Sequence, residues 1–187
     1  MTSILNRYFD PMIELIRSYG GIIGKFGGDA MTVLFPYSQM EARDVALRSI
    51  QCALDMQAKM VNYQDISTSG GTYELTMKAG LAAGPLFLTT IGDPAIRLEY
   101  IVAGQALDYC AEAEHLASRG QVVVHVGLQE LAGLTTEKLN KEYGLLKDKD
   151  VWRGELPRRE VVTVSQDGER TIAAFCILRL RSVFRRD

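Results

Sequence analysis

The sequence predicts a single domain of mixed α and β structure, with helices packed on one side of a mainly antiparallel sheet. Three observations predict this fold class. The length of 187 residues suits one domain. Hydrophobic residues make up 47% and charged residues 24%, a balance typical of chains that fold around a core. Helical and strand-like patterns follow one another in the order helix, hairpin, helix, strand, strand, helix, strand.

The first elements are predicted by periodicity and by glycine. Apolar residues recur at helical spacing over residues 4–19 and predict an amphipathic helix. Pro11 lies inside this pattern, so either the helix kinks there or a second helix begins with Asp10 as its N-cap. Two short apolar runs then flank Gly27 and Gly28, which predicts a tight hairpin because a primed turn needs a positive φ angle.

The middle of the chain continues this alternation, with breaks at loop-forming residues. The predicted elements are a helix over 40–62, a loop at 67–72, a strand or strand pair over 73–91 broken at Gly84-Pro85, a strand over 97–102, a helix from Gly104 to about Ser118 and a strand over 121–125.

The last third of the chain is less regular. We expect a short helix over 126–133 and a polar, irregular segment over 134–160. Two apolar runs, 160–165 and 171–180, predict a hairpin that turns at Asp167-Gly168. With no linker or repeat in the sequence, we expect one domain over residues 1–187, with C-terminal strands at about 160–180.

Charge and composition exclude several classes of function. The formal net charge of -2 provides no global basic field for nucleic acid or anionic lipid. No apolar run reaches the length of about 20 residues that a transmembrane helix needs, and the N-terminus shows no signal-peptide pattern. The three cysteines are widely spaced and lie among apolar residues, as reduced core residues do. We therefore expect a cytoplasmic protein with no membrane span and no nucleic-acid partner.

The segment Lys25-Phe-Gly-Gly-Asp29 is the most informative for chemistry. A carboxylate at the tip of a glycine hairpin suits a hard cation such as Mg²⁺, and the glycines allow a polyphosphate to approach the backbone. The alternative is a Gly-Gly-Asp turn selected for its dihedral angles alone. The segment is not a Walker A loop, because its lysine precedes the glycines and no Ser or Thr follows it.

Three segments in order carry a resemblance to a known family: LNRYFDPMIELIRSYGGIIGKFGGDAMTVLFP, LTMKAGLAAGPLFLTTIGDPAIRLEYIVAGQALDYCAEAEHLAS and GQVVVH. They cover about residues 5–125. They resemble the class III nucleotidyl cyclases, the adenylate and guanylate cyclase catalytic domain, and in particular the first catalytic half of bicarbonate-responsive soluble adenylyl cyclases. This resemblance implies a ferredoxin-like βαββαβ core and an active site formed between two such domains.

The resemblance also implies roles for individual residues. Asp29 falls on the second of two aspartates that hold two divalent cations, Mg²⁺ or Mn²⁺, against the triphosphate. Lys25, Phe26, Gly27 and Gly28 fall on the substrate-binding hairpin, and Lys78 falls where first-half domains often have an arginine that reaches the phosphates. Lys78 could equally be a solvated strand residue.

The sequence departs from the family pattern at several positions. The first metal aspartate and the first strand of the core have no counterpart ahead of Asp29, so we expect both to be missing from this chain. Asp108 and Glu112 stand where the family has an asparagine and an arginine. Ile101 stands at a position that contacts the base, and Ala111 at one where soluble-branch first halves carry a bicarbonate-linked arginine.

Together these features lead to a functional hypothesis. The resemblance implies conversion of ATP, or GTP, to the cyclic nucleotide and pyrophosphate, with a second cyclase domain as the partner in a homo- or heterodimer. Asp29 and Lys78 are the candidate catalytic residues. A pseudo-cyclase that only regulates a partner, and a metal-dependent phosphohydrolase or nucleotidyl transferase on a similar core, are the alternatives. We expect His115 and His125 to be structural.

Overall fold

The computed structural model describes residues 2–64, 66–68, 71–157 and 171–186. The helices are α1 (Thr2–Ser18), α2 (Ala42–Lys59), η1 (Met60–Tyr63), α3 (Gln105–Leu116) and α4 (Val126–Ala132). The strands are β1 (Ile22–Gly27), β2 (Ala30–Tyr37), β3 (Ile66–Thr68), β4 (Gly71–Asp93), β5 (Arg97–Ala103), β6 (Val122–His125), β7 (Glu137–Lys138), β8 (Tyr143–Leu145) and β9 (Thr171–Arg186). Mixed α+β structure around a mainly antiparallel sheet confirms the predicted fold class.

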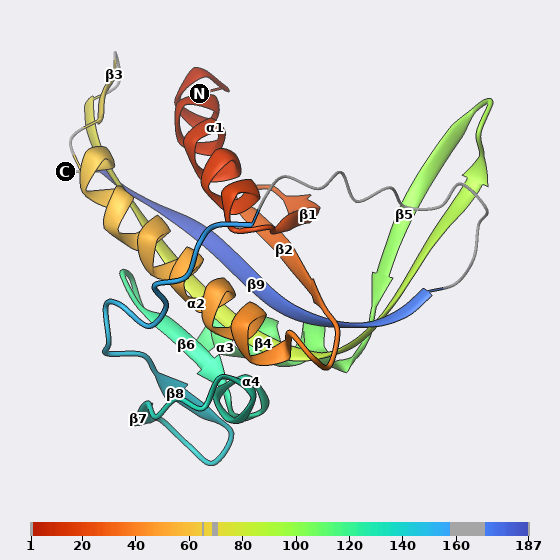
Figure 1. Cartoon of the computed structure of the whole chain (residues 1–187). Helices are drawn as coiled ribbons and strands as arrows, with labels where there is room; N and C mark the ends of the chain where they lie inside the picture. Colours follow the sequence, from red (N-terminus) through yellow and green to blue (C-terminus); the bar gives the residue numbers. More distant parts are fainter. Residues whose placement is uncertain (1, 65, 69–70, 158–170, 187) are drawn as a thin grey trace.

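The sheet has the strand order β1-β2-β9-β4-β6-β8-β7, with β3 and β5 also paired to β4 (Figure 1). Every pairing is antiparallel except that of β4 with β6, which is parallel. The chain connects these two strands through β5 and the helix α3. Where β5 pairs with β4, the two strands form a long hairpin that projects from the body as an arm (Figure 1).

Strand β9 is the last element of the chain, yet it lies between β2 and β4. It is antiparallel to both, with Ala30 opposite Arg181 on one side and Lys78 opposite Arg181 on the other. In a ferredoxin-like core the first strand lies between the third and fourth strands. The position of the strand expected to be missing is therefore taken by β9. The expected partner strand, 160–165, lies outside the described residues.

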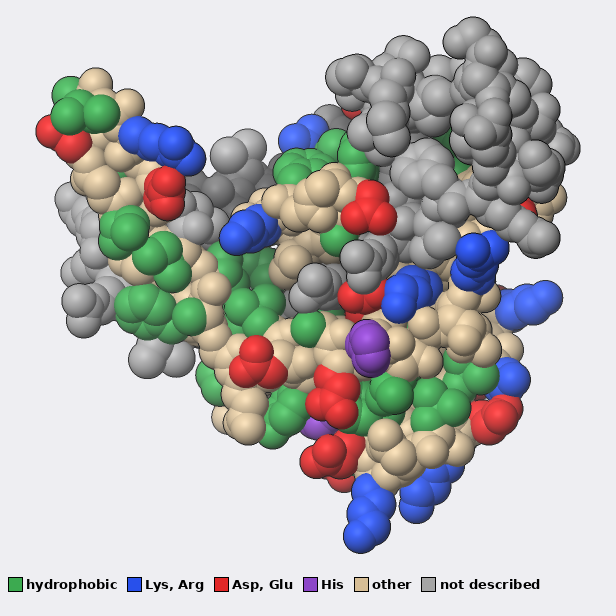
Figure 2. All heavy atoms as spheres, turned by 180° about the vertical axis from the view of Figure 1, so that it is seen from behind, with side chains coloured by type: hydrophobic (Ala, Val, Ile, Leu, Met, Phe, Trp, Pro, Cys, Tyr) green, Lys and Arg blue, Asp and Glu red, His purple; other side chains and the backbone are tan. Residues whose placement is uncertain are grey.

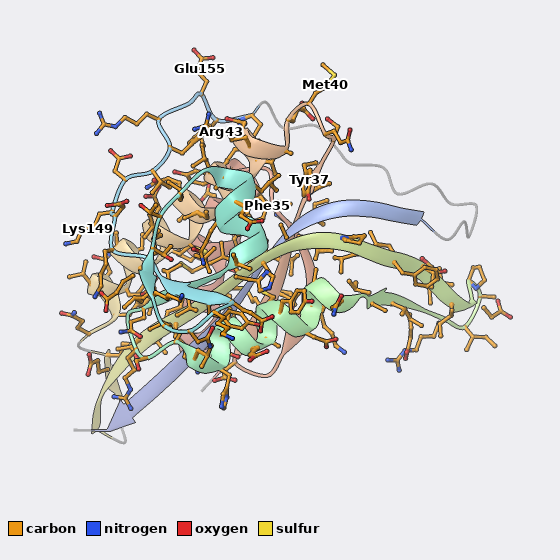
Figure 3. All side chains as sticks on the ribbon, turned by 90° about the horizontal axis from the view of Figure 1, so that it is seen from below. Phe35, Tyr37, Met40, Arg43, Lys149 and Glu155 are labelled. Atoms are coloured by element: carbon orange, nitrogen blue, oxygen red, sulfur yellow. The ribbon has the colours of Figure 1, made fainter. Side chains whose placement is uncertain are left out.

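Helices cover both faces of the sheet, so the prediction that they lie on one side is wrong. Alternation along β4 places Leu75 and Met77 in the main core with α1 and α2, whereas Ala82 packs with α3. Gly80 contacts α3 so closely that a Cβ atom there would lie 2.1 Å from the backbone nitrogen of Glu114. On the other face, Arg43 of α2 donates a hydrogen bond from Nε to the carbonyl oxygen of Ala132 in α4 (3.4 Å), which joins the two helices (Figure 3).

Helix α1 runs through Pro11 as one element. The predicted alternative of a second helix that begins with Asp10 as its N-cap is therefore wrong. Met12 and Ile16 follow the proline and are completely buried against the core. Their burial favours a continuous helix despite the missing N–H of proline.

Strand β4 is likewise unbroken at Gly84-Pro85, where a break was predicted. On one edge β4 pairs with β6 up to Leu81 and with β5 from Phe87 onward. Pro85 falls in the interval between these pairings, where an edge strand tolerates a residue without an N–H group. The strand can therefore continue from the body into the arm.

Candidate functional site

The β1–β2 turn presents the predicted carboxylate. Gly27 pairs with Ala30, so Gly28 and Asp29 are the two central residues of the turn. Gly28 has φ +65°, which suits the first central position of a primed turn. Asp29 occupies the second position and is partly buried. Phe26 is half-exposed and its ring meets that of Phe9 edge to face, with centroids 5.6 Å apart.

A pocket of about 390 Å³ lies beside this hairpin, between β1, β5 and α3. It collects four positions that the sequence singled out from separate segments: Lys25, Ile101, Asp108 and Ala111. Its other lining residues are Gly24, Thr32, Glu99, Val102, Leu107 and Cys110. Figure 2 shows the molecule from behind, with its surface hollowed where the arm leaves the body.

The pocket combines apolar walls with a few charges. Lys25 is its cation, and Glu99 and Asp108 are its carboxylates. Glu99 also forms an exposed ion pair with Arg97 (3.0 Å). Such a lining can hold a flat apolar group with polar edges. Sequence reasoning missed Glu99, although its alternation with Ile101 along β5 places both on the same face of the strand.

Lys78 does not line this pocket. Its ammonium lies 2.9 Å from the carboxylate of Glu114 on α3, and the two side chains are only 15% and 5% exposed. The sequence predicted Lys78 as a phosphate ligand or as a solvated strand residue. The geometry instead shows its charge balanced by a buried carboxylate, an ion pair that fixes α3 on β4.

Glu112, which reverses the charge of the family arginine, has a structural partner. The hydroxyl of Tyr143 on β8 donates a hydrogen bond to its carboxylate (3.0 Å). Burial, together with this bond, raises the pKa of Tyr143. Glu112 therefore ties α3 to the neighbouring strand.

His125 is structural, as predicted. It caps α4 because its Nδ1 accepts a hydrogen bond from the backbone N–H of Gly127 (3.2 Å). Its ring stacks on Tyr109 of α3, with centroids 4.2 Å apart. Burial lowers the pKa of His125, while the carboxylates of Glu142, Glu112 and Glu130 oppose that shift.

The side chains that the structure describes do not by themselves form a two-metal centre. In the part of the chain that the structure describes, no group of three or more His, Cys, Asp or Glu side chains could hold a metal ion. The strand that follows β2 across the sheet is β9, whose residues 171–186 include no Asp or Glu. Opposite Ala30 and Thr32 it carries Arg181 and Arg179. Among the described residues, the β1–β2 turn therefore contributes one carboxylate, that of Asp29.

Comparison with known proteins gives the family context. A scan of protein-family models matches none to this chain. Over 124 residues, 66% of the chain, the sequence is 29% identical to adenylate cyclase type 10 of Oryctolagus cuniculus and 27% identical to that of Homo sapiens. The match spans 7% of the length of these much longer proteins.

Solved structures share the architecture. The guanylyl cyclase Cya2 superposes with a TM-score of 0.58 at 24% identity, covering 95% of this chain and 79% of that one. The adenylyl cyclase CyaB from P. aeruginosa gives 0.59 at 20% identity, covering 83% and 85%. The fold is that of a class III cyclase catalytic domain. The predicted resemblance is confirmed in sequence and in fold.

A third cyclase structure was solved with a nucleotide. The catalytic core of a rhodopsin-guanylyl cyclase, in complex with ATPαS, gives a TM-score of 0.55 at 16% identity and covers 93% of this chain and 79% of that one. Among the residues that the structure describes, no helix is long and apolar enough to cross a membrane.

Proposed function

We propose that this chain is one half of a two-domain class III cyclase and that the pair converts ATP to cyclic AMP and pyrophosphate. One observation carries the proposal. The pocket beside the β1–β2 hairpin unites Lys25, Ile101 and Asp108, which come from distant segments and fall on family positions for the nucleotide. The sequence similarity to adenylate cyclase type 10 supports ATP over GTP.

In this proposal the hairpin forms one side of the nucleotide site. Gly27 and Gly28 leave the turn open, since a Cβ atom at either would meet nothing within 4 Å. A phosphate chain can therefore approach the backbone there. Phe26 lies exposed next to them. Asp29 is the one carboxylate that this turn offers to a divalent cation, so the remaining ligands come from outside the described residues.

The partner domain supplies the groups that stabilise the transition state. Charge stabilisation at the transferring phosphorus is usually the largest catalytic contribution. Asp108 and Glu112 on α3 are negative, and Glu112 is held by Tyr143. The cation of Lys78 is balanced by Glu114. We therefore expect the isolated chain to have negligible cyclase activity.

A cyclase assay tests this proposal. The chain is incubated with Mn²⁺ and ATP or GTP, alone and mixed with a competent second-half domain. We expect cyclic AMP only in the mixture, and loss of at least tenfold with Asp29→Asn. Asp148→Asn, an exposed carboxylate elsewhere, is the matched control and should retain full activity. Robust turnover by the chain alone would contradict the half-site proposal.

A second candidate, a regulatory pseudo-cyclase, is favoured by the two internal pairs. In the first pair, the charge of Lys78 is balanced by Glu114, and in the second, Glu112 accepts a hydrogen bond from Tyr143. These charged groups therefore stabilise the fold and do not contact a substrate. A regulator changes the activity of its partner but has no chemistry of its own. In the same mixture, partner activity that is altered by the chain and unaffected by Asp29→Asn would support this candidate.

A further inference from the structure

A second, smaller pocket lies at the far edge of the sheet, where α4 meets the β7–β8 hairpin (Figure 1). We call it the edge pocket. It shares no lining residue with the pocket beside the β1–β2 hairpin. Its volume is about 250 Å³, below the range of about 300–1,000 Å³ that is usual for drug-sized ligands, so it suits a small ligand.

Internal hydrogen bonds brace the walls of the edge pocket. The hydroxyl of Thr136 donates to Oε1 of Gln129 on α4 (2.8 Å), and Nε2 of Gln129 donates to the carbonyl oxygen of Val124 on β6 (2.7 Å). Gly144 of β8 allows the loop to pack this closely, since a Cβ atom there would overlap Oγ1 of Thr136. The loop, the helix and the sheet are therefore held together around the cavity.

Positive charge exceeds negative charge in this lining. Lys138 on β7 and Lys141 in the β7–β8 turn both line the pocket, and within the described part of the chain neither forms an ion pair. The neighbouring carboxylate of Glu137 is paired instead with Lys147 (2.9 Å). Glu142 is the one carboxylate among the lining residues, so two ammonium groups face a single opposite charge.

Neutral donors accompany the two lysines. Oδ1 of Asn140 accepts hydrogen bonds from the backbone N–H groups of Glu142 and Tyr143, each at 2.9 Å. The amide oxygen is therefore used within the turn, and Nδ2 is the atom with which Asn140 can donate to a ligand. Thr135, in the loop that precedes β7, adds an exposed hydroxyl to the lining. Such a set of donors suits an anion with several acceptor oxygens.

We propose that the edge pocket binds a phosphate group, with Lys138 and Lys141 balancing its charge and Asn140 and Thr135 donating to its oxygens. A phosphomonoester carries a charge of about −1.5 to −2 at pH 7 and three acceptor oxygens, so it matches two ammonium groups better than a carboxylate does. Free phosphate and a phosphorylated side chain share this chemistry. The site lies apart from the pocket of the proposed cyclase function and does not depend on it.

Calorimetric titration of the full chain at pH 7.5 tests the proposal, with inorganic phosphate and O-phosphoserine as separate probes at constant ionic strength. We expect saturable one-to-one binding. Lys138→Gln and Lys141→Gln should each weaken it by about five- to tenfold, because each removes a charge-assisted contact. Lys138→Arg keeps the charge and should bind within about threefold of the unmodified chain. Tighter binding of O-phosphoserine would assign the pocket to a phosphorylated side chain, and tighter binding of phosphate would assign it to the free ion.

Lys149→Gln is the matched control. It removes the same charge from the segment after β8, where Lys149 is exposed, projects outward (Figure 3) and does not line the pocket. It should bind within about twofold of the unmodified chain, because solvent and salt screen a distant charge. Glu142→Gln should tighten binding by about two- to fivefold, since it removes a repelling charge. Circular dichroism confirms that each variant is folded.

Two results would overturn the proposal. One is the absence of saturable binding for both probes. The other is an equal loss of affinity with Lys149→Gln and Lys138→Gln, which would show only general charge attraction. Neither result involves a nucleotide or a partner domain, so failure of this inference is distinguishable from failure of the proposed function.

Discussion

At the scale of single residues, Glu112 shows how an unusual charge acquires a structural role. It stands on α3 at a position where the cyclase family that this sequence resembles has an arginine. Its carboxylate accepts a hydrogen bond from the hydroxyl of Tyr143. Tyr143 is itself buried against His125, with ring centroids 5.3 Å apart. The Glu112 side chain thus helps to fix α3, the helix that forms one wall of the pocket.

We predict that Tyr143→Phe lowers the free energy of unfolding by about 1 kcal/mol, because it removes the hydroxyl but keeps the buried ring. Urea denaturation measures the change. Glu112→Gln keeps an oxygen that can accept the bond and should cost less. If Tyr143→Phe proves neutral, the bond contributes nothing to fixing α3.

His125 gives a second prediction, on pH. Its pKa is lowered in the folded state below the ordinary value of 6.5, so the folded protein disfavours the charged imidazole. Above about pH 6.5 the imidazole is neutral in both the folded and the unfolded state, so His125 does not lower the stability of the fold. As the pH falls from there through the folded-state pKa, protonation favours the unfolded state and the free energy of unfolding decreases. The melting temperature should therefore fall on acidification from about pH 7.5 to pH 5.5.

The variant His125→Asn separates this effect from other titrations. Asparagine can still cap α4 but does not titrate, so its melting temperature should depend less on pH over this range. His115→Gln is the control, because it removes an exposed imidazole on α3 instead of the buried one at the start of α4. An identical pH slope in His125→Asn would refute the assignment.

At the scale of elements, the contact between α3 and β4 positions the pocket. Gly80 allows the helix backbone to approach the strand, and Cys110 donates a hydrogen bond from its thiol to the Gly80 carbonyl (3.1 Å). Cys110 also lines the pocket, so this contact sets the distance between sheet and helix at the site.

We predict that Gly80→Ala destabilises the protein by about 3 kcal/mol, since its Cβ atom would collide with the backbone of α3. Thermal unfolding measures the loss. Gly27→Ala is a suitable control because nothing lies within 4 Å of its Cβ position, and it should cost under about 1 kcal/mol. Equal effects at the two positions would mean that α3 adjusts freely.

At the scale of the whole molecule, β9 joins the two halves of the sheet. On one side it pairs with β2 and on the other with β4, and within the described residues the β1–β2 hairpin reaches the rest of the sheet through it. The segment that leads toward β9 is itself anchored: Trp152 donates a hydrogen bond from its indole N–H to Asp44 of α2 (2.7 Å).

We predict that a chain ending at Pro157 does not fold cooperatively, because it exposes two sheet edges and the apolar faces beside them. Size-exclusion chromatography and far-UV circular dichroism should show an aggregated or partly unfolded species. Coexpression of residues 158–187 as a separate segment should restore a compact complex. A monomeric, cooperatively unfolding truncated chain would show that β9 is dispensable.

The sequence by itself determined the local elements and the candidate positions. Glycines at the β1–β2 turn and at Gly104 marked the hairpin and the start of α3, because these φ angles are positive and costly for other residues. The resemblance pointed to Lys25, Ile101 and Asp108, which the fold brings into one pocket.

Only the tertiary structure decided which groups meet. The pairing of Lys78 with Glu114, the contact of Glu112 with Tyr143 and the inclusion of Glu99 in the pocket join residues far apart in the chain. The place of β9 between β2 and β4 is the largest such decision. Local periodicity predicts that a segment is a strand, but its neighbours depend on which apolar faces and hydrogen-bonding edges remain open when the whole chain packs.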